Sequence, residues 1–396
     1  MGVVAVIGDA LRMAFTMWWE ILWALILGFA ISAAVQAVVS TKEMVRVLGD
    51  DRPKTLAVAC GLGAASSSCS YAAVAIARSL VRKGANFTAA MAFELASTNL
   101  VVELTVIMVL LLGWQFAAAE FVGAPLMVAI MALLFRRFLT RRMTEDATAQ
   151  ADKGVAGRME GHAEMHMEVA DGRPLLRRLF SPEGRTAVSH YFVMDWAAVW
   201  LDIALGLLIA GALAVMVPKG FWNAFFLSNH PSLAKVWGPI VGPLVAIVSF
   251  VCSVGNVPLA AVLWNSGISF GGVVAFVFAD LIILPILDIY RRYYGRRMSW
   301  FLLWTLYLSM VGAAYVVELL FGALGLVPAT RSARVLEETI SWNYTTWLDL
   351  GFLVLAGVLI VRFLRTGGPA MLRMMNAPWM PGGHDMHGSG HAPRAG

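Results

Sequence analysis

The chain has 396 residues, of which 59% are hydrophobic and only 14% are charged, and its mean hydropathy is +0.74. Soluble domains contain about 45–50% apolar residues, so this composition excludes an ordinary soluble protein. The formal net charge of +5 does not indicate nucleic-acid binding, because the basic residues gather at the ends of apolar runs.

The charged residues separate apolar runs of about 20 residues, the length that a helix needs to cross a bilayer. The first predicted span covers residues 13–39, with Trp18, Trp19 and Trp23 near one end as candidate interfacial anchors. The start of the chain lacks the basic region of a cleavable signal peptide, so we expect this first span to be retained.

A segment rich in small residues follows Pro53 and reads CGLGAASSSCS from Cys60 to Ser70. Spans are predicted at 87–112 and 117–139, with a short turn near Gly113. The stretch from 140 to 190 is polar and basic with little helical periodicity, so we predict a cytoplasmic loop.

The second half contains another small-residue motif, Val251–Pro258. Its predicted spans cover 195–217, 270–290 and 299–325, and a last span at 346–364 has no counterpart in the first half. The tail, 367–396, is rich in Gly, Pro, Met and His, and we expect it to be disordered.

The two halves match in one ungapped alignment, the repeat register, which places Cys69-Ser70 on Cys252-Ser253. Identical pairs continue on both sides: Leu22, Leu25, Ile26, Gly28, Val74, Ala77, Gly84, Phe87, Ala92, Phe93 and Ala96 recur as Leu205, Leu208, Ile209, Gly211, Val257, Ala260, Gly267, Phe270, Ala275, Phe276 and Ala279. Internal duplication is typical of secondary transporters, so we predict membrane repeats over 10–139 and 191–325.

Loop charges favour one of two topologies. If every apolar segment crosses the membrane, the basic loops Arg136–Arg142 and Arg291–Arg297 fall on opposite sides, against the positive-inside bias. If each Cys-Ser segment is instead a re-entrant hairpin, each repeat crosses three times and both basic loops lie inside. Broken backbone at membrane depth occurs where protein or water covers it, as at a transport site. The alternative is that Gly and Ser only allow close helix packing.

We therefore expect an all-α polytopic membrane protein. It is built of two inverted repeats, each with three spanning helices and a re-entrant Cys-Ser hairpin, plus one extra C-terminal span. The same charge distribution places the C-terminus in the cytoplasm.

The two Cys-Ser motifs carry candidate substrate ligands. A pseudo-two-fold axis could bring Cys69 and Cys252 to one central site, and thiolates prefer soft ions such as copper(I), zinc or trivalent arsenic. The alternative is that both are small buried hydrophobic residues. The other candidates in and beside the motifs are Ser70, Ser253, Asn256 and Pro258.

Acidic residues inside predicted spans are candidate proton carriers, because a charge at membrane depth is costly and faces a cavity or a relay. Glu94 lies in the apolar run Met91–Ala96 and is the first choice, and Asp280 in the corresponding span is the second. Helical spacing places Glu103 at about the same angular position as Glu94, and Asn99 lies between them. Asp288 precedes Arg291 and is predicted to form an interfacial ion pair.

Histidine and methionine cluster at residues 159–167 of the central loop and in the tail, and these two segments hold five of the seven histidines. Imidazole and thioether groups suit copper and zinc, and a histidine pair four residues apart would share a helix face. The alternative is a solvated segment of accidental composition. The candidate metal ligands are His162, Met165, His166, Met167, His384, Met386, His387 and His391.

The first motif, ending in Arg82-Lys83-Gly84 and followed by Ala92-Phe93 and Ser97-Thr98-Asn99, resembles the ArsP-type permease family. The second motif fits the same pattern, so the resemblance covers most of residues 10–325. That family contains organoarsenical efflux permeases and related predicted metal-efflux permeases. The resemblance implies a multi-span permease and an exporter.

We expect a permease of the cytoplasmic membrane that exports a small soft metal ion or metalloid by secondary transport, with protons as the coupling ion. No cofactor, enzymatic activity or nucleic-acid partner is expected, since the chain has neither an HExxH nor a Walker A sequence. One alternative is a permease for a small anion or organic solute bound by hairpin N–H groups and Ser hydroxyls. Another is a non-transporting membrane subunit that senses metal or assists assembly.

Overall fold

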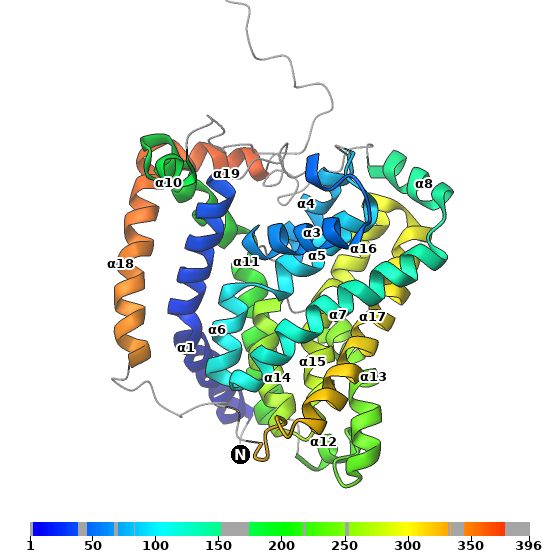
Figure 1. The fold of residues 1–396 in the computed structure, drawn as a ribbon. Coiled ribbons are helices and arrows are strands. Elements are labelled where there is room, and N and C mark those ends of the chain that lie inside the picture. The colour runs from blue at the N-terminus through cyan, green and yellow to red at the C-terminus, as the bar shows by residue number, and fades with distance from the viewer. Residues whose placement is uncertain are drawn as a thin grey trace, which may run out of the picture.

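The computed structural model describes residues 3–38, 46–66, 70–82, 84–151, 174–216, 219–249, 253–331, 333 and 344–376. These ranges are helical and contain no strand, so the expected all-α class is confirmed for them (Figure 1). The first half contains α1 (Val3–Val38), α3 (Pro53–Ser66), α4 (Ser70–Arg82), α5 (Phe87–Asn99), α6 (Val102–Leu111) and α7 (Trp114–Phe138).

Two short helices, α8 (Arg141–Ala151) and α10 (Leu175–Phe180), connect the halves. The second half contains α11 (Pro182–Met216), α12 (Lys219–Phe225), α13 (Pro231–Ser249), α14 (Ser253–Asn265), α15 (Phe270–Phe278), the 3₁₀ turn η1 (Ala279–Leu281), α16 (Leu284–Tyr294) and α17 (Arg296–Ala323). The chain continues into α18 (Tyr344–Arg365) and α19 (Gly368–Asn376).

Several of these helices are long and apolar enough to cross a membrane. Within the described residues, five segments qualify: α7, α13, α15 with α16, α17 and α18. The pair α5 and α6 also qualifies as one span, but it bends by 41° at its break. The multi-span character expected from the hydropathy is confirmed. α13, which precedes the second Cys-Ser motif, is 19 residues long and is itself among the candidate spans.

Helix boundaries recur in the repeat register. This alignment carries α4, Ser70–Arg82, onto α14, Ser253–Asn265, and it carries the first residue of α5 onto the first residue of α15. Both turns use glycine with positive φ, +98° at Gly84 and +109° at Gly267, a conformation that costs glycine little. The equivalent residues Asn86 and Ser269 both cap the following helix by accepting backbone N–H groups.

Each half also packs its small-residue segment on the helix that follows. α3 and α4 contact α5, and α13 and α14 contact α15. The helices approach closely at glycine: a Cβ added to Gly63 would lie 2.3 Å from the carbonyl oxygen of Phe93, and one added to Gly242 would lie 2.4 Å from that of Gly272. These two crossings therefore require glycine.

The basic segments Arg136–Arg142 and Arg291–Arg297 lie at the same end of the molecule. Gln150 at the end of α8 donates its amide Nε2–H to the carbonyl of Arg292, at 3.2 Å, and α8 packs on α16. Arg78 of α4 donates to the carbonyl of Ala151, with Nη2 at 2.7 Å, and lies over the ring of Tyr293. Figure 1 shows α8, α10 and α19 at this end and α12 at the other. An arrangement with these segments on opposite sides is thus excluded.

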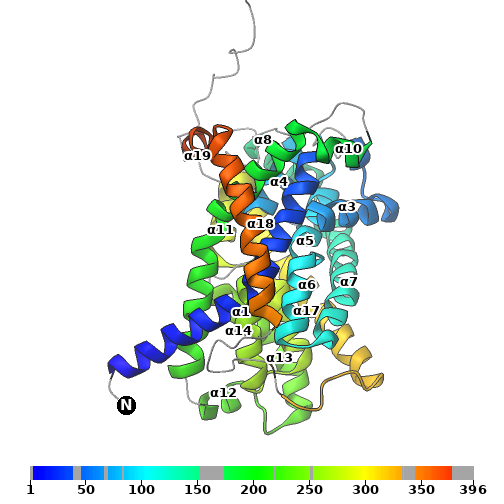
Figure 2. The same cartoon turned by 90° about the vertical axis from the view of Figure 1, so that its left-hand side faces the viewer.

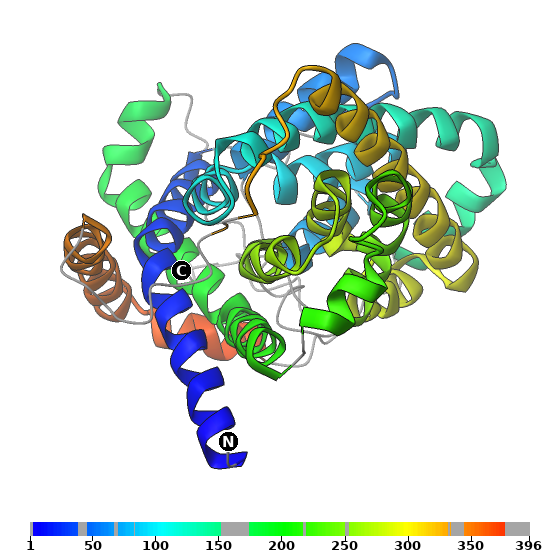
Figure 3. The same cartoon turned by 90° about the horizontal axis from the view of Figure 1, so that it is seen from below.

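The helix α18 lies at the side of the molecule against α1 and α11 (Figures 1 and 2). The indole Nε1–H of Trp19 donates to Thr346 at 3.2 Å, and the backbone N–H of Trp23 donates to Asp349 at 2.8 Å. Seen from below in Figure 3, the N-terminal part of α1 projects away from the other helices. The extra span is therefore tied to the middle of α1.

Three expectations about the chain between and beyond the repeats are corrected. Part of the predicted loop at 140–190 is helical, since α8 buries Met143, Ala147 and Ala151 at four-residue spacing. α11 begins at Pro182, before the expected start of the second repeat. The tail begins with a helix, α19, while residues 377–396 lie outside the described ranges. The sequence does not predict α8, because its short amphipathic period lies among many charged residues.

Candidate functional site

Both repeats interrupt a helix at the same place. α5 ends at Asn99 and α6 begins at Val102, while η1 ends at Leu281 and α16 begins at Leu284. The repeat register carries Leu100, between α5 and α6, onto Ile283, between η1 and α16. Breaks at membrane depth free backbone polar groups, and they occur where protein or a transported solute satisfies them.

The turns at Gly84 and Gly267 bring Ser70 and Ser253 to the two breaks. The turn at Gly84 folds α4 back along α5, and because both helices rise equally per residue, Ser70 comes level with Asn99. The turn at Gly267 folds α14 back along α15 in the same way, which brings Ser253 level with η1. The Ser70 end of α4 and the Ser253 end of α14 therefore both lie at the interrupted region.

Asp280 of η1 accepts a hydrogen bond from the hydroxyl of Ser70, with Oγ to Oδ2 at 2.7 Å. Both side chains have no exposed surface. Ser70 is the first described residue of α4, so the hydrogen bond joins this end of α4 to η1. The hydroxyl of Thr98 also interacts with Asp280. A carboxyl group of the second repeat thus binds a serine hydroxyl of the first.

Glu94 of α5 makes a second link between the halves. The phenol of Tyr290 in α16 donates a hydrogen bond to Oε1 of Glu94. Glu94 is 1% exposed and Tyr290 is fully buried. The charge of Asp280 interacts with both Glu94 and Tyr290. The Ser70–Asp280 and Tyr290–Glu94 hydrogen bonds are therefore electrostatically coupled.

Buried polar atoms without a hydrogen-bond partner in the described part of the chain gather in this region. They include Oε2 of Glu94, Oδ1 of Asn99, both carboxyl oxygens of Glu120, both amide atoms of Asn256 and Oδ1 of Asp280. A buried polar group left without a partner costs roughly 1–3 kcal/mol, so such groups are uncommon and informative. Their concentration at the breaks indicates a site for protons, water or a bound solute.

Glu120 and Tyr290 were not among the residues singled out from the sequence. Glu120 lies in α7, is 1% exposed and is near enough to Asp280 for their charges to interact. A single carboxyl group inside the apolar run Phe116–Val122 was a signal that could have found it. Nothing in the sequence marked Tyr290, because tyrosine is also common at membrane interfaces.

The expectation that Glu103 shares a helix face with Glu94 is wrong. It assumed one continuous helix, whereas the break after Asn99 redirects the chain by 41°. Glu103 instead packs on α1, where a Cβ added to Gly28 would lie 2.3 Å from the Cβ of Glu103. The predicted ion pair of Asp288 is confirmed, since its carboxylate lies 2.6 Å from Arg291 and 2.7 Å from Arg292.

Other predicted ligands fall partly or wholly outside the described residues. Asn256 and Pro258 lie in the first turns of α14, and Ser253 begins that helix. Cys69, Cys252 and the eight candidate Met and His ligands lie outside the described ranges: His162, Met165, His166, Met167, His384, Met386, His387 and His391. Among the described residues, no three His, Cys, Asp or Glu side chains are placed to hold one metal ion.

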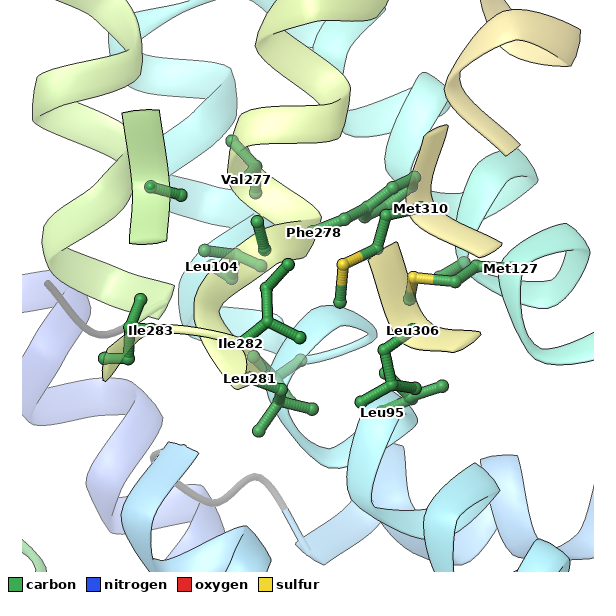
Figure 4. Close-up of a cluster of buried hydrophobic side chains, with 14 of the residues drawn as sticks. Leu95, Leu104, Met127, Val277, Phe278, Leu281, Ile282, Ile283, Leu306 and Met310 are labelled. Atoms are coloured by element: carbon green, nitrogen blue, oxygen red, sulfur yellow. The ribbon is translucent and has the colours of Figure 1, made fainter. Parts of the chain in front are cut away.

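Apolar side chains surround the interrupted helices. Figure 4 shows Leu95 and Leu104, from the two sides of the first break, near Leu281 and Ile282 of the second. Met127 of α7 and neighbouring residues of α17 complete this cluster, and all of these side chains are buried. An apolar surrounding lowers the local dielectric constant, which strengthens each electrostatic interaction among the carboxyl groups.

The chain is similar to known proteins over most of its length. A family model with the description "Predicted permease", ArsP_1, matches residues 6–319. A Mycobacterium tuberculosis protein named "Putative permease Rv2963" is 63% identical over 348 residues, which cover 88% of this chain and 86% of that protein. No solved structure matches the chain.

Proposed function

Because the chain belongs to the ArsP_1 family of predicted permeases, we propose that its transport path runs through the centre where the two interrupted helices meet. The observation that supports this place is the buried hydrogen bond from Ser70 to Asp280, which joins the two halves of the chain. Unpartnered atoms of Glu94, Glu120 and Asn256 lie buried in the same region. A solute in transit would supply their partners.

The two halves form inverted repeats in this proposal. The recurrence of helix boundaries in one register supports a duplicated unit. The shared end of the basic segments supports the inversion, because three crossings per half bring α8 and the start of α17 to one side. In such transporters the substrate binds between the repeats, and alternating access exposes it to either side.

Proton coupling is assigned to Asp280 and Glu94, with Glu120 close to Asp280. Like charges in a dry region repel one another, so these carboxyl groups cannot all be ionised together at low cost. When a carboxyl group gains a proton on one side of the membrane, its hydrogen bond to Ser70 or Tyr290 would weaken. Loss of the proton on the other side would restore that hydrogen bond. These links cross between the halves, so their exchange couples protonation to the movement of one half against the other.

For the cargo we propose a small soft metal ion or metalloid moved outward. Cys69 and Cys252 directly precede Ser70 and Ser253, which begin α4 and α14, and thiolates suit such cargo. The methionine- and histidine-rich segments would collect the cargo on the cytoplasmic side. In this proposal the C-terminus lies in the cytoplasm.

The test is accumulation of copper, zinc and trivalent arsenicals in cells with and without the protein. We expect reduced accumulation of one species, loss of this effect in Asp280→Asn and its retention in the matched control Asp288→Asn. Asp288 lies in the same interrupted span but pairs with Arg291 and Arg292 at its end. Unchanged accumulation of every species would refute soft-ion export, and full activity of Asp280→Asn would refute the role of that carboxyl group.

A further inference from the structure

Two neighbouring buried oxygen atoms have no hydrogen-bond partner in the described part of the chain: Oε2 of Glu94 and the hydroxyl oxygen of Tyr294. The two side chains are 1% and 2% exposed, so bulk solvent does not reach them. The charge of Glu94 acts on Tyr294, which shows that the two groups lie near each other. Buried polar groups without a partner are rare, so two of them together indicate that a small polar molecule binds between them.

The helices α5 and α16 place these two groups one above the other. Tyr290 and Tyr294 are one turn apart on α16, and their rings stack with centroids 6.2 Å apart and planes at 28°. The hydroxyl of Tyr290 donates to Glu94, and the ring of Tyr294 meets the edge of Phe87 at 5.3 Å. Phe87 lies seven residues before Glu94, on the same face of α5. Both tyrosines therefore face α5, and Tyr294 lies nearer the end of α16.

The spacing of the two groups suits one water molecule. Four residues of α16 rise by about 6 Å, which separates the hydroxyl of Tyr294 from that of Tyr290. The Tyr290 hydroxyl already binds the other oxygen of Glu94. A water that bridges two oxygen atoms spans about 5.5 Å, twice the length of an O–H···O hydrogen bond. Such a water would give both the Tyr294 hydroxyl and Oε2 of Glu94 a partner.

The other repeat has no polar groups at the equivalent positions. The repeat register carries Glu94, Tyr290 and Tyr294 onto three buried apolar residues, Val277, Ile107 and Leu111. In an inverted arrangement the two sets lie toward opposite ends of the protein. The polar set lies toward the end of the molecule that carries Arg291–Arg297, the basic end, because α16 runs directly into this segment.

We propose that Tyr294 and Glu94 bind one water molecule between them, and that this water carries protons between Glu94 and the basic end. Tyr294 lies in the last turn of α16, directly before Gly295 and the exposed Arg296. Tyr294 is a positioning residue, since its hydroxyl orients the water. The water passes a proton to Oε2 of Glu94 and regains one from solvent at the basic end. The inference rests on the proposed role of Glu94 in proton coupling, and it names the side from which this proton comes.

The charged and titratable groups that act on this pair come from three elements. Asp280 of η1 acts on Glu94, in addition to Tyr290 of α16. Arg78 of α4 and Tyr293 of α16 act on Tyr294. The guanidinium group of Arg78 binds the carbonyl of Ala151 and lies over the ring of Tyr293, so it is held near the basic end. Its positive charge favours the ionised form of Glu94 and thus the release of the proton to the water.

The test follows the C=O stretching band of protonated Glu94 by infrared spectroscopy of the full-length protein over a pH series. Glu94→Gln assigns the band by removing it. Tyr294→Phe keeps the ring that contacts Phe87 and Tyr290 and removes only the hydroxyl group. In this variant we expect the band to shift to higher frequency, because the carboxyl group loses its hydrogen bond with the water. We also expect the exchange of the Glu94 proton in D₂O to become slower.

Tyr293→Phe is the matched control, because it removes the hydroxyl group of the neighbouring residue, whose ring lies under Arg78. It should leave the band and the exchange rate unchanged. If either is unchanged in Tyr294→Phe, or if Tyr293→Phe has an equal effect, the inference is overturned, while the transport test of Asp280→Asn keeps its meaning. If Glu94→Gln removes no band at any pH, both this inference and the proposed role of Glu94 as a proton carrier are overturned.

Discussion

The hydrogen bond between Tyr290 and Glu94 gives a quantitative test of the central site. Tyr290→Phe removes one hydroxyl group and leaves both oxygens of Glu94 without a described partner. A hydrogen bond to a charged group contributes about 1.5–3 kcal/mol to stability, against about 0.5–1.5 kcal/mol for a neutral one. We expect the free energy of unfolding to fall by about 1.5–3 kcal/mol if Glu94 is ionised in the resting protein.

A second substitution separates the charge from the hydrogen bond. Glu94→Gln keeps an acceptor but removes the charge, so Tyr290→Phe should cost only about 0.5–1.5 kcal/mol in that background. Glu94→Met removes the acceptor at similar length, and in that background Tyr290→Phe should cost nearly nothing. The difference between the backgrounds is the coupling energy of the pair.

The assay is equilibrium unfolding in detergent micelles, followed by tryptophan fluorescence. Tyr307→Phe is the matched control, because the Tyr307 hydroxyl donates to the carbonyl of Ile240 at 2.9 Å, away from Glu94. Tyr307→Phe should lower the free energy of unfolding by the same amount in every Glu94 background. If Tyr290→Phe costs as much in Glu94→Met as in the original protein, the two side chains are not coupled and the link between the halves is refuted.

Two further predictions concern the helix packing and the loop before α3. Gly63→Ala should lower the free energy of unfolding by about 1–3 kcal/mol, because its Cβ would lie 2.3 Å from the Phe93 carbonyl oxygen. Gly61→Ala, with nothing within 4 Å, should not lower it, and equal losses in thermal melting would contradict the close crossing. Hydrogen bonds from the Thr55 hydroxyl and the Arg52 N–H, with the charge of Arg52, hold the pKa of Asp50 below its ordinary value. Its ionised form therefore favours the folded state above the unfolded pKa, and this contribution is lost as the pH falls through the folded pKa. Thr55→Ala should raise the pKa of Asp50 in an NMR titration, and an unchanged value would refute the role of the hydroxyl.

The amino-acid sequence determined the class of this protein and much of its internal order. Apolar runs and the charges between them depend only on local composition, so they predicted the span-length apolar helices α7, α15 with α16, α17 and α18 without knowledge of their contacts, although they did not predict α13 as a span. The repeat register also survives in the structure, because turns at Gly84 and Gly267 and caps at Asn86 and Ser269 are local features. Glu94 and Asp280 could be singled out because a carboxyl group in an apolar run is costly wherever it points.

Only the tertiary structure decided which of these groups meet. Ser70 and Asp280 are 210 residues apart in the chain, and Glu94 and Tyr290 are 196 apart, so no local pattern links them. The position of Glu103 could not be deduced either, because helical spacing describes an unbroken helix and the chain turns between the two residues. Sequence periodicity reports which face of a helix a residue occupies. The packing of the two halves against each other determines which side chains of the interrupted helices form hydrogen bonds with one another.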